Sequence, residues 1–275
     1  MIPTYEELLI NLEGIPNARQ LGGYINQHGQ RIKNNVLLRS GSLYKATEKD
    51  LEYLAKNIGI KLVFDFRSDN EIESKPDKEI AGAENIKLDL LSRINNEAVK
   101  KIFMDKDEGE KDEHPVIRMC RKPILIEHMT NLYGRLVQDS HAHELYNIMF
   151  KRVLASGGAP FLWHCAYGKD RTGIAALLIL SALEVDMAII REDFLRTNIA
   201  YKKNIDMLVK MAKKENFSET QIWTVKSIVG VAEESFDSGV KIINEKYGGA
   251  RNYLRNQIGI TDEEIKQFQE YYLEK

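Results

Sequence analysis

A cysteine and an arginine with five residues between them stand between two apolar runs of this chain. The first run, residues 160–163, is short, and the second, residues 174–183, has the length of a buried helix. This order predicts a strand, a tight loop and a helix, which are the building units of an α/β fold. The ten residues between the runs carry reactive and polar side chains: His164, Cys165, Ala166, Tyr167, Gly168, Lys169, Asp170, Arg171, Thr172 and Gly173.

The segment from Cys165 to Arg171 has the length and position of an anion-binding loop. Backbone amides at a helix start lack intrahelical partners, and the helix dipole adds partial positive charge there. We expect the planar fork of Arg171 to clamp two oxygens of a tetrahedral oxyanion and the loop to surround the rest. The same field favours a thiolate over a thiol at Cys165, and a thiolate below a phosphoryl group suits cleavage of phosphate esters. The residues predicted to bind phosphate are Ala166, Tyr167, Gly168, Lys169, Asp170 and Arg171.

Three neighbouring residues fit a supporting role. Gly168 lets the turn approach the anion closely. The Thr172 hydroxyl is placed to hydrogen-bond the thiolate and later to help it leave. We expect His164 to be buried and to orient the loop through its carbonyls rather than to act as a base.

The bulk properties exclude several classes of protein. The 275 residues carry a formal charge of −2, so nucleic-acid binding is not expected and any affinity for phosphate must be local to a site. Two cysteines, Cys120 and Cys165, are too few for a disulfide framework, and a reducing compartment suits a nucleophilic thiol. No signal peptide is visible, and no apolar stretch is long enough for an integral membrane segment. We therefore expect a cytoplasmic protein, or a secreted one if a leader has been removed; the sequence does not define an oligomeric state.

Hydrophobic periodicity extends the α/β prediction along the chain. Residues 60–66 indicate a strand, which is followed by a short strand at 86–88. The strand is preceded by an amphipathic helix that Thr47 caps and that ends near Gly59. Residues 124–154, 194–212 and 219–245 have helical spacing, and Thr261 caps a last helix. The predicted fold is a short, mostly parallel central sheet flanked by helices, with a helical lid or insertion at 93–150 or 190–240.

The segment from His164 to Thr172 resembles the H-C-x5-R-[ST] signature of the protein tyrosine and dual-specificity phosphatases. Its Gly-Lys-Asp-Arg-Thr-Gly version is similar to an atypical bacterial and fungal subgroup, which includes a secreted mycobacterial tyrosine phosphatase and a Listeria lipid phosphatase. Residues 17–24, 37–43, 65–71 and 247–255 resemble further motifs of that subgroup, with Gln20 standing where the family usually has Asp. The resemblance covers residues 14 to about 260. It implies a tyrosine phosphatase-like fold in a single phosphatase domain over 1–275, with a helical C-terminal part at 190–275.

Two aspartates compete for the role of general acid, which protonates the leaving group. Asp170 lies inside the loop, and the resemblance implies an acid role for it. Asp65 follows a predicted strand, at the sheet edge where α/β folds place ligands. It can equally hold Arg67 or a loop amide in place. We favour Asp170 and keep Asp65 as the alternative.

Lys169 bears on the choice of substrate. A second cation at the rim of the loop suits a substrate with more than one phosphate, and the lipid phosphatases that the chain resembles carry a lysine in this loop. Phosphoinositides therefore join phosphotyrosine, and phosphoserine or phosphothreonine, as candidate substrates. The alternative is a solvated charge at the rim.

Three other features favour structural roles. Residues 93–123 form a highly charged insertion, which indicates a solvated surface segment, with a mobile lid as the alternative. Cys120 is more simply a passive thiol than a redox-active one. His141 and His143 lack a recognised metal-ligand spacing and are interpreted as surface histidines, and we predict no metal and no cofactor.

The sequence thus predicts a metal-independent phosphatase that acts through a phosphocysteine intermediate. Two alternatives stay open. A rhodanese-like sulfurtransferase also surrounds a cysteine with loop amides, and a module could bind phosphoryl groups without turnover.

Overall fold

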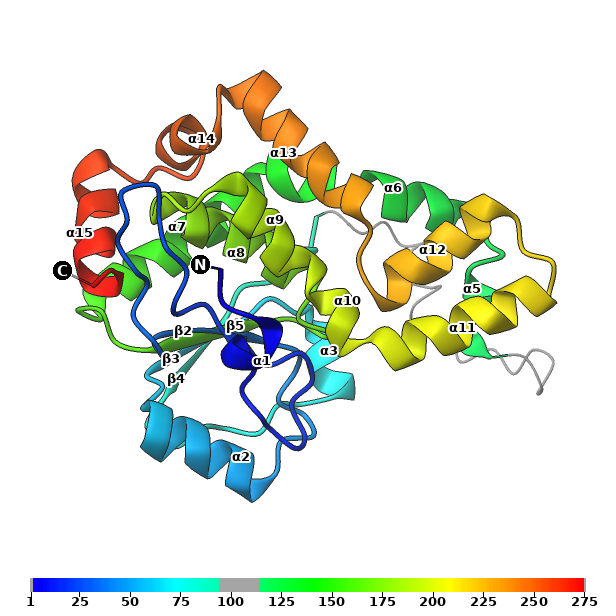
Figure 1. The fold of residues 1–275 in the computed structure, drawn as a ribbon, viewed down its shortest axis with the longest axis horizontal. Helices are drawn as coiled ribbons and strands as arrows, with labels where there is room; N and C mark the ends of the chain where they lie inside the picture. Colours follow the sequence, from blue (N-terminus) through cyan, green and yellow to red (C-terminus); the bar gives the residue numbers. More distant parts are fainter. Residues whose placement is uncertain (1, 94–113, 275) are drawn as a thin grey trace.

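A five-stranded sheet lies at the centre of the computed structural model, which describes residues 2–93 and 114–274 (Figure 1). The strand order is β1 (Arg19–Gln20), β2 (Leu37–Ser40), β5 (Phe161–His164), β3 (Leu62–Asp65) and β4 (Glu84–Lys87). Only β1 is antiparallel to its neighbour, and the other pairs are parallel. The predicted mostly parallel α/β sheet is confirmed. Of the predicted charged insertion at 93–123, residues 94–113 lie outside the described residues.

Both faces of the central strands are buried, because the side chains of a strand point alternately to opposite faces. On β5, Phe161 and Trp163 join the larger core and Leu162 joins the smaller one. On β3, Phe64 joins the larger core and Val63 joins the smaller one. This two-sided burial explains why both segments appear as nearly continuous apolar runs.

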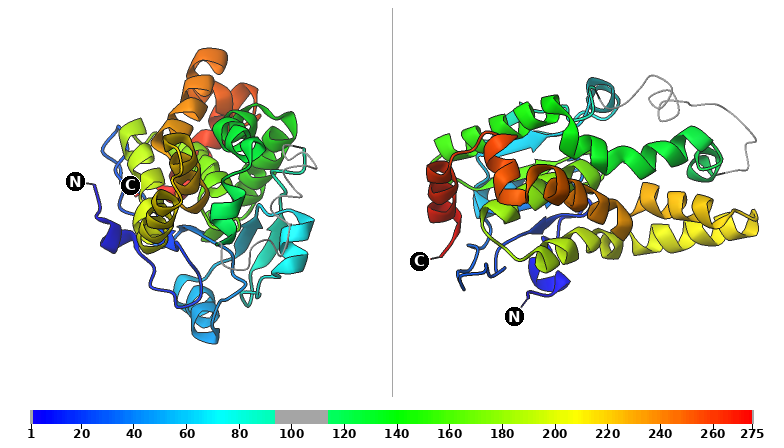
Figure 2. Two further views of the ribbon diagram at one scale, coloured as in Figure 1. Left: turned by 90° about the vertical axis from the view of Figure 1, so that its right-hand side faces the viewer. Right: turned by 90° about the horizontal axis from the view of Figure 1, so that it is seen from above.

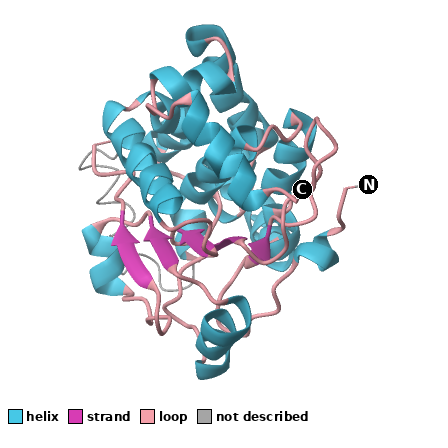
Figure 3. Cartoon of the chain, turned by 90° about the vertical axis from the view of Figure 1, so that its left-hand side faces the viewer, coloured by secondary structure: helices cyan, strands magenta, loops and turns pink. Residues whose placement is uncertain are grey.

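Most helices cover one face of the sheet, and few cover the other (Figure 3). The sparsely covered face carries α2 (Glu48–Glu52), which continues as the π-helical segment η1 (Tyr53–Ile58). Thr47 caps this helix and Gly59 ends it in the left-handed region, as the sequence predicts. The crowded face carries α6 (Pro123–Gln138), α7 (Ser140–Ala155), α8 (Asp170–Ala182), α9 (Met187–Leu195), α13 (Glu233–Tyr247), α14 (Ala250–Asn256) and α15 (Asp262–Tyr272).

A group of helices projects beyond the sheet and has its own apolar cluster (Figure 2). It consists of α5 (Pro115–Met119), α11 (Lys202–Lys214) and α12 (Glu219–Val229), and we call it the helical extension. The short α10 (Thr197–Ala200) leads into it. The predicted stretches 194–212 and 219–245 are therefore each divided into separate helices. No helix within the described ranges has both the length and the apolar character needed to cross a bilayer.

The parallel strands end at one edge of the sheet, and this positions the sequence motifs. Ser40, His164 and Asp65 occupy the same register on β2, β5 and β3. The segments that follow them contain Gly41, Cys165 and Phe66, and α3 (Asp69–Ser74) comes next after β3. Three motifs that lie far apart in sequence therefore meet at the carboxyl edge of the sheet.

Candidate active site

The loop after β5 turns its carbonyl groups outward, toward donors from other parts of the fold. The Ser42 amide donates to the Ala166 carbonyl, and the Tyr201 hydroxyl to the Tyr167 carbonyl at 2.8 Å. The Gly168 carbonyl accepts from Asn17 Nδ2 at 2.9 Å and Arg39 Nη2 at 3.0 Å. These donors fix the orientation of three successive peptide groups.

The opposite sides of these peptides carry amides with no acceptor among the described residues, from Ala166 through Lys169. Gly168 makes this turn at φ +66°, and a Cβ there would lie 2.3 Å from the Ser40 carbonyl oxygen. Only glycine fits that position. Unpaired amides that follow one another at the start of a helix form a site for an anion.

Arg171 is held so that one edge of its guanidinium remains available. Nη1 and Nη2 donate to the two carboxylate oxygens of Glu71 at 2.7 and 2.8 Å, and Nη1 also donates to the Phe66 carbonyl. A guanidinium has five N–H groups, so the Nε hydrogen and the second Nη2 hydrogen remain. Those two lie on one edge and form the fork that binds two oxygens of a phosphate. Burial alone would raise the pKa of Glu71, but Arg171 outweighs it and lowers that pKa to about 2.

Asp170 begins α8, and both of its carboxylate oxygens have partners. Tyr133 Oη on α6 donates to Oδ1 at 2.6 Å, and Lys169 Nζ lies 3.2 Å from Oδ2. Lys169 in turn donates to the carbonyls of Ser227 and Gly230, at the end of α12. The prediction of a rim position for Lys169 is wrong: the residue is only 4% exposed, because the end of the helical extension covers it.

A buried network with more cations than anions lies behind the loop. Arg19 Nε and Arg39 Nη1 contact the two carboxylate oxygens of Asp193 at 2.9 and 2.6 Å. We call these three residues the cationic cluster. Burial would raise the pKa of Asp193, but the two arginines hold it at about 2. Burial and the nearby Arg19 lower the pKa of Arg39 to about 10, which leaves it protonated at neutral pH.

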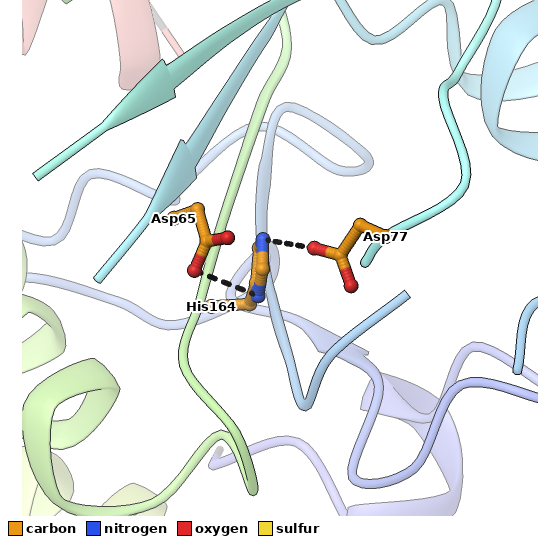
Figure 4. Close-up of side chains that lie close together, drawn as sticks. All are labelled: Asp65, Asp77 and His164. Carbon is orange, nitrogen blue, oxygen red and sulfur yellow. Dashed lines mark ion pairs between the residues drawn. The ribbon is translucent and has the colours of Figure 1, made fainter. Parts of the chain in front are cut away.

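A second network lies at the ends of β3 and β5: Figure 4 shows Asp65, Asp77 and His164, and Arg67 joins them. We call it the acidic cluster. Arg67 Nη2 lies 2.7 Å from Asp65 and 2.8 Å from Asp77, and Arg67 Nε also donates to Asp65. The His164 Nε2 atom lies 3.1 Å from Asp77, and Nδ1 lies 3.4 Å from the Cys165 carbonyl. The Asp65 carboxylate therefore holds Arg67 in place, which is the structural alternative to an acid role that the sequence left open for Asp65.

The acidic cluster is also the group of side chains that comes closest to a metal site among the described residues. Ligand atoms of Asp65, Asp77 and His164 lie within 4.8 Å of one another. Arg67 already contacts both carboxylates, so a divalent cation would have to displace a buried guanidinium. The donor set therefore does not suit a metal ion.

Cys165 and Thr172 lie at the two ends of the loop, and both are buried. Cys165 is buried at the end of β5, directly before the unpaired amides. Thr172 Oγ1 is buried and has no hydrogen-bond partner within the described chain, while the Thr172 carbonyl accepts from Trp163 Nε1 at 3.1 Å. The Thr172 hydroxyl is thus free to bond a thiolate or a bound anion.

Three residues outside the loop receive structural explanations. Burial raises the pKa of Cys120 to about 12, which fits a passive thiol and not a redox-active one. The prediction of a surface position for His143 is wrong, since it is buried with Nε2 3.0 Å from the Val137 carbonyl. Gln20, which departs from the family motif, accepts from the amides of Gly22 and Asn35 and so closes the turn between them.

Comparisons with known proteins show the family to which the chain belongs. A family model described as the tyrosine phosphatase family matches residues 10–274, and the chain belongs to that family. It is similar to a provisionally named tyrosine-protein phosphatase of Cupriavidus necator, with 28% identity over 263 residues that cover 94% of this chain and 86% of the relative. It is also similar to the triple specificity protein phosphatase PtpB of Mycobacterium tuberculosis, with 24% identity over 80% of this chain and 86% of that protein. A tyrosine-protein phosphatase of Nostoc commune is 24% identical over 86% of this chain and 74% of the relative.

Some residues of the site were not predicted from the sequence. Glu71 stands in a recognised motif, but its contact with Arg171 was not predicted. Arg19 and Arg39 could have been suspected as single charges within apolar segments. Asp193 and Tyr133 gave no signal, because each occupies one position of an ordinary amphipathic helix.

Proposed function

We propose that this phosphatase hydrolyses phosphate monoesters by nucleophilic attack from Cys165. The observation that supports this most directly is the arrangement of the loop: outward carbonyls, unpaired amides from Ala166 to Lys169, and the free edge of Arg171. Together these groups match the oxygens of a phosphoryl group above the cysteine.

The proposed reaction has two steps. The Cys165 thiolate attacks phosphorus, a P–S bond forms, and the P–O bond to the leaving group breaks as Asp170 gives that oxygen a proton. A water molecule then attacks the phosphocysteine and passes its proton to Asp170, and the P–S bond breaks to release phosphate. We assign the acid to Asp170 and not to Asp65, because three hydrogen bonds from Arg67 engage the Asp65 carboxylate.

Phosphotyrosine is the proposed first substrate class. Tyr167 lies in the loop with 54% of its surface exposed, and its ring makes an edge contact with Tyr201 at 6.4 Å between centroids. The exposed Tyr167 ring, supported by the half-buried Tyr201, is suited to packing against a phenyl ring beside the loop. The names of the relatives point to the same substrate.

Phosphoserine, phosphothreonine and phosphoinositides are weaker candidates. To reach a second phosphate, the Lys169 ammonium would have to leave the carbonyls of Ser227 and Gly230. If Lys169 acts only within the fold, Lys169→Ala lowers kcat/KM by the same factor for a phosphotyrosine peptide and a phosphoinositide. A larger loss for the phosphoinositide would assign Lys169 to a second phosphate.

The nucleophile is tested by comparing the two cysteines of the chain. We expect the wild type and Cys120→Ala to release 4-nitrophenolate in a burst that equals the enzyme concentration, followed by steady turnover. Cys165→Ser should lose both phases, and Arg171→Lys should lose most of the turnover because lysine has no fork. An active Cys165→Ser variant would refute the mechanism.

The purified wild type also separates phosphatase activity from the two alternatives, a rhodanese-like sulfurtransferase and a phosphoryl-binding module without turnover. A sulfurtransferase would form a persulfide on Cys165 with thiosulfate and pass the sulfur to cyanide. A binding module would bind phosphotyrosine without releasing phosphate in a single turnover.

A further inference from the structure

The carboxyl group of Asp170 lies where three parts of the fold meet. The residue begins α8, Tyr133 approaches from α6, and Lys169 connects it to the end of α12. Helix α6 belongs to the helical layer and not to the sheet edge that carries the other motifs. A contact from α6 to the catalytic loop therefore joins the two layers of the molecule.

Tyr133 is held rigidly in this position. Its side chain is almost fully buried, and its ring packs edge-on against Phe194 at 5.7 Å between centroids. Burial, reinforced by the charge of Asp170, raises the pKa of Tyr133 well above its usual value. The phenol therefore keeps its proton throughout the pH range of the protein.

The two partners of Asp170 differ in what they can offer. Lys169 is a cation that has only donors. The Tyr133 hydroxyl is neutral and donates to Oδ1, which keeps acceptor capacity whether or not the carboxyl group carries its proton. Two other charged or titratable groups face Asp170, namely the adjacent Arg171 and His128 on α6, whose pKa is lowered to about 4 mainly by burial.

We propose that Tyr133 is a positioning residue for proton transfer by Asp170, holding the carboxyl group in one orientation in both of its protonation states. The inference rests on the proposed function, since it requires Asp170 to be the acid. During transfer the O–H bond of Asp170 breaks and an O–H bond forms on the leaving oxygen. The Tyr133 hydroxyl donates to Oδ1 before and after the transfer and keeps its own proton.

The test compares two substrates that differ in their need for an acid. The 4-nitrophenolate anion leaves readily without a proton, whereas phenolate from phenyl phosphate is more basic and depends on protonation. We expect Tyr133→Phe to lower kcat/KM for phenyl phosphate by about tenfold and to change that for 4-nitrophenyl phosphate by less than about threefold. The ratio of the two rates does not depend on the folded fraction, so a loss of stability cannot imitate this result.

Tyr253→Phe is the matched control. Tyr253 is also a fully buried tyrosine packed against α6, and its hydroxyl donates to the Val137 carbonyl at 2.9 Å. It has no contact with Asp170, so its removal should leave the ratio unchanged. Asp170→Asn should change the ratio in the same direction as Tyr133→Phe, and by more.

The possible failures are distinguishable. If Asp170→Asn changes the ratio and Tyr133→Phe does not, the positioning role is refuted and the proposed function stands. If Asp170→Asn leaves the ratio unchanged, Asp170 is not the acid and the inference falls with that assignment. If the wild type releases no phosphate from either ester, the proposed function itself is refuted.

Discussion

The cationic cluster and the acidic cluster lie beside the same cysteine loop but have opposite compositions. The first has two arginines around Asp193, and the second has two carboxylates around Arg67. The cationic cluster reaches the loop directly, because Arg39 donates to the Gly168 carbonyl. The acidic cluster reaches the loop only at its first residue, where His164 contacts the Cys165 carbonyl.

The difference concerns the charge that lies behind the loop, apart from Arg171 at the start of α8. Buried positive charge behind the amides favours an anion in front of them, and it is weakly screened by solvent. In the acidic cluster the negative charge lies beside His164, and Arg67 offsets one of the two carboxylates. We infer that the cationic cluster serves both stability and the loop, while the acidic cluster serves mainly to hold the strand ends.

The largest expected effect concerns Asp193. Asp193→Asn leaves two buried arginines without a counter-charge, and we expect the free energy of unfolding to fall by about 3–5 kcal/mol. Asp77→Asn is the matched change in the acidic cluster, where Arg67 keeps Asp65, and it should cost about 1 kcal/mol. Urea unfolding followed by circular dichroism gives both values. Equal losses would remove the distinction between the clusters.

The clusters should also respond differently to acid. A carboxyl group with a lowered pKa contributes stability above its unfolded pKa, and that contribution is lost as the pH falls through the folded value. For Asp193 the pKa falls from 3.8 to about 2, which corresponds to about 2 kcal/mol lost between about pH 5 and pH 2.

In the acidic cluster the two carboxyls oppose each other. Burial would raise the pKa of Asp65, but the charges of His164 and Arg67 overcome it and lower that pKa. Burial raises the pKa of Asp77, so the contribution of Asp77 to the stability of the fold increases as the pH falls. Unfolding measured from about pH 6 to about pH 3 should show a flatter pH dependence for Asp193→Asn and a steeper one for Asp77→Asn. A flatter curve for Asp77→Asn would contradict these assignments.

The smallest expected effect is on catalysis. Arg39→Lys keeps the charge but cannot reach both Asp193 and the Gly168 carbonyl, and we expect kcat to fall about tenfold, or about 1.4 kcal/mol. Arg67→Lys, the same change in the acidic cluster, should reduce kcat by about threefold. Steady-state kinetics with 4-nitrophenyl phosphate would measure kcat for both variants. A larger loss for Arg67→Lys would mean that the loop depends on the acidic cluster instead.

The sequence predicted the strand, loop and helix around Cys165 well, because each element has a local signature. The apolar run of β5, the left-handed Gly168 and the start of α8 at Asp170 are all visible in neighbouring residues. The capped helix ends at Thr47 and Thr261 were predictable for the same reason. Lys169 was misplaced because the carbonyls that cover it come from a helix about sixty residues later in the chain.

The sequence by itself determined the strand, loop and helix around Cys165 and the α/β class, since these depend on residues within a few positions of one another. Only the tertiary structure decided which charges stand behind the loop. Asp193, Glu71 and Tyr133 reach their partners across 154, 100 and 37 residues. A long-range pair leaves no local pattern, because its energy depends on desolvation and geometry that exist only once the helices have packed against the sheet.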